Sequence, residues 1–221
     1  MLSEEIIGII GGTGPEGQGL ALRFGLAGFP IIIGSRNSGK GTATIEKLSS
    51  IASNLSICSK DNISTAEQSD IVIISVPFEA HQSTLETIKS KLQGKIVINV
   101  VVPLTFKNGT AYSVSPPEGS AAVQSQNLLP ESRVVSAFHN VAAPHLLKRS
   151  HPVDCDVIVC GDDEQAKMKV CSLAEHIQGV KSIDGGPLSN SQFSEQLTAL
   201  LINLNKIHRS HTMIRFTGLP M

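Results

Sequence analysis

The sequence predicts an α/β fold in which helices cover both faces of a doubly wound, mostly parallel sheet. Two observations support it. Apolar runs typical of buried strands alternate along the chain with segments of helical periodicity. The first run, Ile6–Ile10, leads directly into Gly12-x-Gly14-x-x-Gly17, and a segment with helical potential follows at residues 19–24. A strand, a glycine turn and a helix start in this order are typical of a Rossmann-type dinucleotide-binding unit.

The glycine turn predicts a pyrophosphate site. Glycines let the backbone turn tightly and approach the ligand, which then meets free N–H groups at the start of the helix. Pro15 has no N–H to donate. The expected site is therefore Gly12 together with four candidate donors: Thr13, Gly14, Glu16 and Gly17.

The second apolar run, Ile31–Ile33, indicates which dinucleotide binds. A chain that binds NAD usually carries Asp or Glu after this strand, about 20 residues past the glycines, to hold the ribose hydroxyls. Here Ser35 and Arg36 stand at that distance with no acid beside them. Because a hydroxyl and a guanidinium bind a 2′-phosphate that a carboxylate would repel, this pair favours NADP(H). Weaker candidates for the same phosphate are Asn37, Ser38 and Lys40. The alternative is an arginine on a solvated loop.

Further elements follow in order. Four apolar runs predict strands at Ile71–Val76, Ile96–Val102, Val134–Phe138 and Val157–Cys160. Two groups of apolar residues at helical spacing lie between or after them: Leu85, Ile88 and Leu92, and Ala166, Val170, Leu173 and Ile177. The strand crossovers should be right-handed, and the cofactor should lie across the C-terminal ends of strands one and four.

Two segments break this alternation. Leu104–Ser132 is rich in Pro, Gly, Ser and Asn, with a short helix possible near Ser120–Leu129, and a connection of this length is more often functional than idle. Ser182–Leu188 is a strand end and turn. It precedes a helix with an apolar stripe formed by Phe193, Leu197, Leu200, Leu201, Leu204 and Ile207. We expect a dinucleotide-binding domain at residues 1–181. Residues 182–221 form a short C-terminal helical appendage that completes the substrate site and contacts a second subunit.

Composition argues against several other classes of protein. Lys plus Arg (18) nearly balance Asp plus Glu (19), so nothing indicates a nucleic-acid partner or an anionic membrane surface. Gly and Pro interrupt the first apolar run, which therefore predicts neither a signal peptide nor a spanning helix, and we expect a cytoplasmic location. The cysteines form no Cys-x-x-Cys pair and no histidine cluster has metal spacing, so we expect no metal site.

The C-terminal ends of parallel strands are where functional groups gather. The residues at these ends, or in the loop that follows the last of them, are Ser75, Val76, Pro77, Val102, Pro103, His139, Asn140, Ala142 and Pro144. We expect the first three beside a nicotinamide ribose and Val102-Pro103 as an apolar wall for a flat ring, with the rest closing the site. Hydride transfer between two rings needs stacking and exclusion of water more than a strong acid or base. Any proton transfer would fall to His139, to solvent or to the second cofactor, and His139 as a structural histidine remains the alternative.

These motifs resemble the F420-dependent NADP reductases over nearly the whole chain. The most specific blocks are Val159–Asp163 and Asp184–Ser191. The resemblance implies reversible hydride transfer between NADPH and C5 of the 5-deazaflavin of coenzyme F420, in a soluble homodimer. It also implies roles for particular residues. Thr13, Ser35 and Arg36 would hold the 2′-phosphate, while Val102-Pro103 and His139–Pro144 would cradle the deazaflavin.

Three other functions stay open. One is an NADP-dependent reductase of a small imine or carbonyl, similar to pyrroline-carboxylate reductases, although those chains generally carry a longer C-terminal helical domain. Another is a reductase domain similar to those fused to membrane metalloreductases. The third is a non-catalytic NADP(H)-binding sensor, which would not need a second site for a planar ring.

Overall fold

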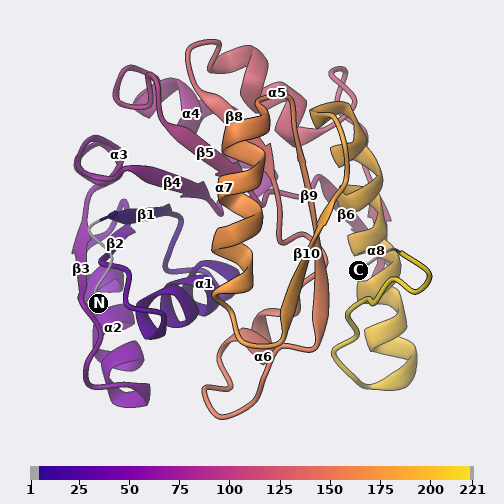
Figure 1. Ribbon diagram of the computed structural model, residues 1–221, viewed down its shortest axis with the longest axis horizontal. Coiled ribbons are helices and arrows are strands. Elements are labelled where there is room, and N and C mark those ends of the chain that lie inside the picture. The colour runs from indigo at the N-terminus through magenta and orange to yellow at the C-terminus, as the bar shows by residue number, and fades with distance from the viewer. Residues whose placement is uncertain (1–4, 220–221) are drawn as a thin grey trace.

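The computed structural model describes residues 5–219, and within them eight strands form one sheet in the order β10-β9-β8-β5-β4-β1-β2-β3 (Figure 1). The strands of this sheet are β1 (Ile7–Ile10), β2 (Ile31–Gly34), β3 (Ile57–Lys60), β4 (Ile71–Ile74), β5 (Ile96–Asn99), β8 (Arg133–Ser136), β9 (Cys155–Gly161) and β10 (Val180–Asp184). A separate antiparallel hairpin consists of β6 (Leu104–Lys107) and β7 (Thr110–Ser113). The pairs from β3 across to β8 are parallel, and β8 pairs antiparallel with β9. The mostly parallel sheet is therefore confirmed.

Helices cover both faces of the sheet, as predicted. The helices are α1 (Pro15–Leu26), α2 (Ser38–Ile51), α3 (Asn62–Gln68), α4 (His81–Ile88), α5 (Ala121–Leu128), α6 (Ala143–Leu146), α7 (Glu164–Glu175) and α8 (Ser191–His208), with short 3-10 turns at Phe78–Ala80, Lys89–Lys91 and Leu188–Asn190. Successive strand residues point to opposite faces. Ile9 accordingly joins the core under α1, α2, α6 and α7, whereas Ile10 joins the core under α3, α4 and α5. Figure 1 shows α7 lying across the near face.

The predicted strands exist, but three of them end earlier than the apolar runs suggest. β4 ends at Ile74, β5 at Asn99 and β8 at Ser136, so the residues that follow are loops at one edge of the sheet. After β5, a side chain takes the place of the next strand-to-strand hydrogen bond. The Asn99 carboxamide oxygen accepts the N–H of Val101 at 2.9 Å. These early ends release the loops that build the site.

The connection Leu104–Ser132 contains more structure than the sequence analysis predicted. The short helix is present as α5, with the Ser120 hydroxyl accepting the Val123 N–H at its start. The hairpin β6–β7 was not predicted. Its turn residues Asn108 and Gly109 both have positive φ, 52° and 74°, which is the signature of a two-residue hairpin turn.

Helix α8 packs on this hairpin and on α5. The Asn203 carboxamide accepts the N–H of Ala111 at 2.8 Å and donates to its carbonyl at 2.9 Å. The apolar stripe predicted for α8 divides between two environments. Leu201 is buried against its own chain, while Phe193, Leu200 and Ile207 are 62%, 54% and 70% exposed. No helix among residues 5–219 has both the length and the apolar character needed to cross a membrane.

Candidate active site

Two adjoining cavities form a continuous cleft at the C-terminal ends of β1 and β4. Their volumes are about 600 Å³ and 440 Å³. The residues that line both are Gly14, Ser75, Val76 and Pro77. In doubly wound sheets, ligands bind at the switch point where strand order reverses, and β1 with β4 is that point here.

The glycine turn holds α1 close to β1 and leaves donors free at the helix start. A Cβ on Gly17 would lie 2.7 Å from the Gly12 Cα, so this approach needs glycine. The Gly14 N–H donates to the Gly11 carbonyl at 3.0 Å and is therefore used within the turn. Among the described residues, the N–H groups of Thr13, Glu16 and Gly17 have no partner and are available to an anion.

The larger cavity is cationic. It is lined by Arg36, Lys40 and Lys47, and no Asp or Glu of the described chain lines it. The Arg36 guanidinium and the Lys40 ammonium are exposed and make no hydrogen bond or ion pair with other described residues. The Lys47 ammonium donates to Gln18 at 2.6 Å, and Gln18 donates to the Thr13 carbonyl at 2.7 Å. This end of the cleft suits a phosphate.

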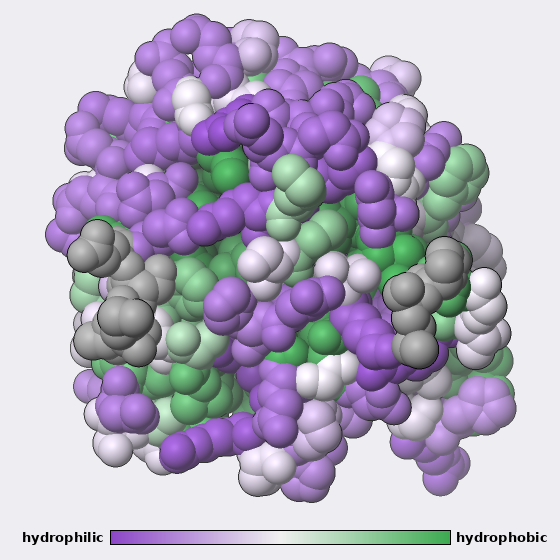
Figure 2. Space-filling view, viewed as in Figure 1, coloured by the Kyte–Doolittle hydropathy of each residue, from purple (hydrophilic) through white to green (hydrophobic). Residues whose placement is uncertain are grey.

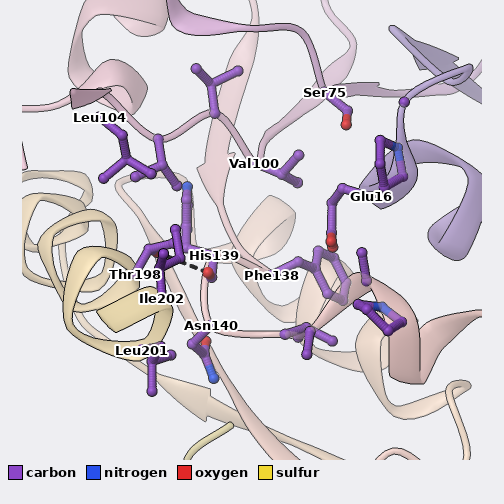
Figure 3. A pocket seen from close by; sticks show the side chains of 18 of the residues that line it. Glu16, Ser75, Val100, Leu104, Phe138, His139, Asn140, Thr198, Leu201 and Ile202 are labelled. Atoms are coloured by element: carbon purple, nitrogen blue, oxygen red, sulfur yellow. Dashed lines mark hydrogen bonds between the residues drawn. The ribbon is translucent and has the colours of Figure 1, made fainter. Parts of the chain in front are cut away.

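The smaller cavity is mostly apolar (Figure 3). Its walls come from the start of α1, the loops after β4, β5 and β8, the start of α6, and α8. The residues from the β5 and β8 loops include Val100, Val101, Val102, Phe138, His139, Asn140 and Ala142, and Pro144 follows in α6. Thr198, Leu201, Ile202 and Asn205 lie along one face of α8, and His211 and Thr212 follow the helix. Such walls exclude water from whatever binds between them.

His139 lies in this cavity with its ring unpaired. The side chain is buried, and neither ring nitrogen has a hydrogen-bond partner among the described residues. Burial lowers the pKa of His139 to about 4, and the Val101 backbone opposes this shift only in part. The imidazole is therefore neutral near pH 7, with one nitrogen able to donate and the other able to accept.

The backbone before His139 is strained. Phe138 has a φ of 68°, which a residue with a bulky side chain rarely adopts and which costs about 1–3 kcal/mol. Its buried ring makes an edge contact with Phe24, with centroids 6.0 Å apart. The next two residues are also anchored. Thr198 donates to the His139 carbonyl at 2.9 Å, and the Asn140 carboxamide donates to the Asp156 carbonyl at 2.6 Å. These contacts fix the loop after β8 against the cavity.

A buried polar network supports the opposite wall. Asn99 donates to the Ser125 hydroxyl at 2.7 Å and lies 3.0 Å from Nε2 of His81. Nδ1 of His81 lies 2.9 Å from the Gln124 carboxamide oxygen. With Nδ1 protonated, each of these contacts has one donor and one acceptor, so His81 is a structural histidine. Because Asn99 also binds the Val101 N–H, the network positions the apolar wall.

Arg23 fixes the loop that borders the cleft from the α6 side. Its guanidinium donates to four backbone carbonyls at 2.7–2.9 Å: His145, Leu146, Lys148 and His151. These carbonyls lie at and beyond the end of α6, where helix carbonyls have no partner within the helix. One arginine of α1 thereby holds the segment that follows Ala142 and Pro144 in place.

The structure brings most of the predicted site residues together. Those that line the cleft are Thr13, Gly14, Glu16, Ser35, Arg36, Lys40, Ser75, Val76, Pro77, Val102, His139, Asn140, Ala142 and Pro144. Within the described chain, Gly12, Gly17 and Pro103 do not line it. The first two shape the turn, and the Pro103 carbonyl accepts the Val114 N–H at the hairpin. Sequence reasoning missed Gln18, Lys47 and the α8 residues. The α8 residues Thr198, Leu201 and Asn205 are spaced three and four apart, and this spacing could have indicated that they share one face of a helix.

The fold and this cleft define a dinucleotide-dependent oxidoreductase. Residues 6–103 match the family model described as NADP oxidoreductase, coenzyme F420-dependent. The F420-dependent NADP reductase of Methanocaldococcus jannaschii is 44% identical, with 97% of this chain and 99% of that protein covered. That of Methanothermobacter marburgensis is 39% identical over the same shares of the two chains. The chain belongs to the F420-dependent NADP reductase family.

A solved structure agrees in fold. The crystal structure of a putative F420-dependent NADP reductase from Arthrobacter sp. FB24 superposes with a TM-score of 0.82. It covers 97% of this chain and 100% of its own, at 22% identity.

Proposed function

We propose that this protein transfers a hydride reversibly between NADP(H) and C5 of the deazaflavin of coenzyme F420. The observation that carries the proposal is the continuous cleft, cationic at one end and apolar at the other. A dinucleotide spans both ends from the glycine turn. The family membership agrees with this, because the relatives are F420-dependent NADP reductases.

The cationic end fits the 2′-phosphate of NADP(H). Arg36 and Lys40 offer unpaired cations, and the Ser35 hydroxyl lies beside them, donating to the Asn37 carbonyl at 2.8 Å. The free N–H groups of the glycine turn fit the pyrophosphate. Charge-assisted hydrogen bonds of this kind are worth about 1.5–3 kcal/mol each, which is enough to separate NADP(H) from NAD(H).

The apolar end fits two stacked rings. Bound there, NADPH supplies the hydride and the deazaflavin accepts it. The chain contributes a water-excluding wall at Val100–Val102, a fixed loop at Phe138–Ala142 and one face of α8. His139 lies in this wall as a neutral imidazole, available to hydrogen-bond a ring substituent. Its pKa of about 4 makes it a weak base at neutral pH, so it orients a ring and does not abstract a proton.

An absorbance assay tests this function. Mixing the protein with NADPH and oxidised F420 should bleach the deazaflavin band, with NADH giving a much slower reaction. NADPH oxidation with a cyclic imine but never with F420 would replace the proposal with the imine reductase alternative. Tight binding of NADPH without reduction of either substrate would indicate a sensor.

A homodimer is the proposed assembly. The exposed faces of Phe193, Leu200 and Ile207 recur at seven-residue spacing along α8. Phe106 and Tyr112 of the adjoining hairpin are 61% and 49% exposed. Figure 2 shows apolar side chains among polar ones at the right of the view, where α8 lies. Apolar surface gathered in this way is typical of a protein interface. The cytoplasmic location and the lack of a nucleic-acid partner stay predictions from composition.

A further inference from the structure

The Glu16 carboxyl is an unusual group to find in this cavity. Glu16 lies in the first turn of α1, and Figure 3 shows its side chain extending toward Phe138. Its Oε1 is buried and has no hydrogen-bond partner among residues 5–219. Burial raises the pKa of Glu16 to about 8, so the group is mostly protonated at neutral pH. A buried carboxyl oxygen without a partner is costly in a structural role and points to an interaction with a ligand.

The course of the dinucleotide brings its nicotinamide to this side chain. The 2′-phosphate end lies at Ser35 and Arg36, and the pyrophosphate lies at the start of α1. The nicotinamide half must therefore pass the shared residues Gly14 and Ser75 into the apolar cavity. Glu16 forms the wall of that cavity at the point of entry. This step rests on the proposed function.

Few other charges face this carboxyl. The remaining titratable side chains that line the cavity in the described chain are His139 and His211. His139 is neutral, as argued above. His211 makes an edge contact with His145 of α6, the helix packed on α1, with centroids 6.1 Å apart. Among the described residues that line this cavity, no Lys or Arg is present to compensate an ionised Glu16.

We propose that Glu16 is the counter-ion of the oxidised nicotinamide ring, ionising when NADP⁺ binds and staying protonated when NADPH binds. The ring carries a positive charge only in NADP⁺, and an opposite charge beside it in a site shielded from water stabilises that form of the cofactor. On NADP⁺ binding, the Glu16 proton leaves to the buffer and the carboxylate pairs with the ring. On NADPH binding no charge arrives and the proton stays. The residue thereby favours the oxidised cofactor more strongly as pH rises toward the pKa of free Glu16.

Calorimetry measures the proton directly. NADP⁺ and NADPH are each titrated into the protein at about pH 7 in HEPES and in Tris, whose ionisation enthalpies differ. The dependence of the binding enthalpy on the buffer gives the number of protons released. The two cofactors share all their phosphates, so those contributions cancel in the difference. The expected difference is about one proton more for NADP⁺.

Variants separate the possible outcomes. Glu16→Gln should abolish the difference and weaken NADP⁺ binding about tenfold while NADPH binding is retained. Glu79→Gln, at an exposed position after β4 that lines neither cavity, should keep the difference. Equal proton release by both cofactors in the unmutated protein overturns the inference, as does a difference that survives Glu16→Gln. Failure of the unmutated protein to bind NADPH at all would instead overturn the proposed function.

Discussion

At the scale of single residues, Arg36 is the side chain that we propose selects the dinucleotide. Its guanidinium is unpaired and lies in a cavity without acids, so it loses little on binding a phosphate. We expect Arg36→Ala to weaken NADPH binding more than tenfold and to leave NADH binding nearly unchanged, as measured by fluorescence titration. Arg209→Ala, at an exposed position outside the cleft, is the control. Equal affinity of the unmutated protein for NADPH and NADH would contradict this assignment.

His139 tests whether the site uses shape or acid–base chemistry. We expect His139→Asn to slow hydride transfer about tenfold, near 1.4 kcal/mol of barrier, because the imidazole orients a ring. Ala142→Phe should slow it far more, since a displaced ring loses its reactive geometry. Single-turnover kinetics measures both. Complete loss of turnover in His139→Asn, with both cofactors still bound, would show that the imidazole does chemistry.

The depressed pKa of His139 also predicts a pH dependence of stability. Between its ordinary pKa of 6.5 and its folded value of about 4, the unfolded chain binds more protons at this residue than the folded chain. The free energy of unfolding should therefore fall as pH drops through that window. Denaturation of His139→Asn should show a shallower fall over the same range, and an unchanged slope would contradict the buried, neutral imidazole.

At the scale of elements, the strands and helices that could be predicted from the sequence are those whose apolar residues follow the pattern of burial. The isoleucine-rich strands β1, β2 and β4 are fully buried and read clearly. β3 was missed because it is an edge strand with little buried surface. The first turns of α2 contain Ser38, Gly39, Gly41 and Thr42, residue types with weak helix propensity, and its start depends on the Asn37 side chain accepting the Lys40 N–H. Elements such as β3 and α2 depend on contacts of the folded chain more than on a pattern of apolar residues.

Glu195 joins α8 to the start of α5. Its two carboxylate oxygens accept the N–H groups of Ala121 and Ala122 at 2.9 and 3.1 Å, in a buried position. Glu195→Ala leaves both donors unpaired, and we expect it to lower the free energy of unfolding by about 2–4 kcal/mol in chemical denaturation. Gln196→Ala, at the exposed neighbouring position, should change it by less than about 0.5 kcal/mol. An equal effect of both substitutions would show that the carboxylate does not join the helices.

At the scale of the whole molecule, the sheet order places the site and the C-terminal helix completes it. Strand ends indicated Ser75 and His139 because parallel strands share an edge. The spacing of Thr198 and Asn205 indicates a shared helix face, but which cavity that face lines depends on how α8 docks on the hairpin. The raised pKa of Glu16 could likewise not be predicted from the sequence, because its cause is burial, which exists only in the folded chain.

The outer face of α8 tests the assembly. Leu200→Glu places a charge on its exposed stripe, and we expect a folded monomer by light scattering at micromolar concentration, because a charge is costly in an apolar interface. Leu201→Glu instead places a charge where the side chain is buried and lines the cavity, and should damage the fold or the site. A monomeric unmutated protein under the same conditions would remove the case for a dimer.

Direct transfer of hydride from ring to ring is the central claim, and an isotope label tests it most directly. NADPH carrying deuterium at the transferred C4 position is mixed with oxidised F420 in ordinary water, and the reduced deazaflavin is analysed by mass spectrometry and NMR. Direct hydride transfer carries the C4 hydrogen to C5 without passing through a species that exchanges with water, so the deuterium should appear at C5 in full. Appearance of the label in water, with unlabelled reduced F420, would contradict the account.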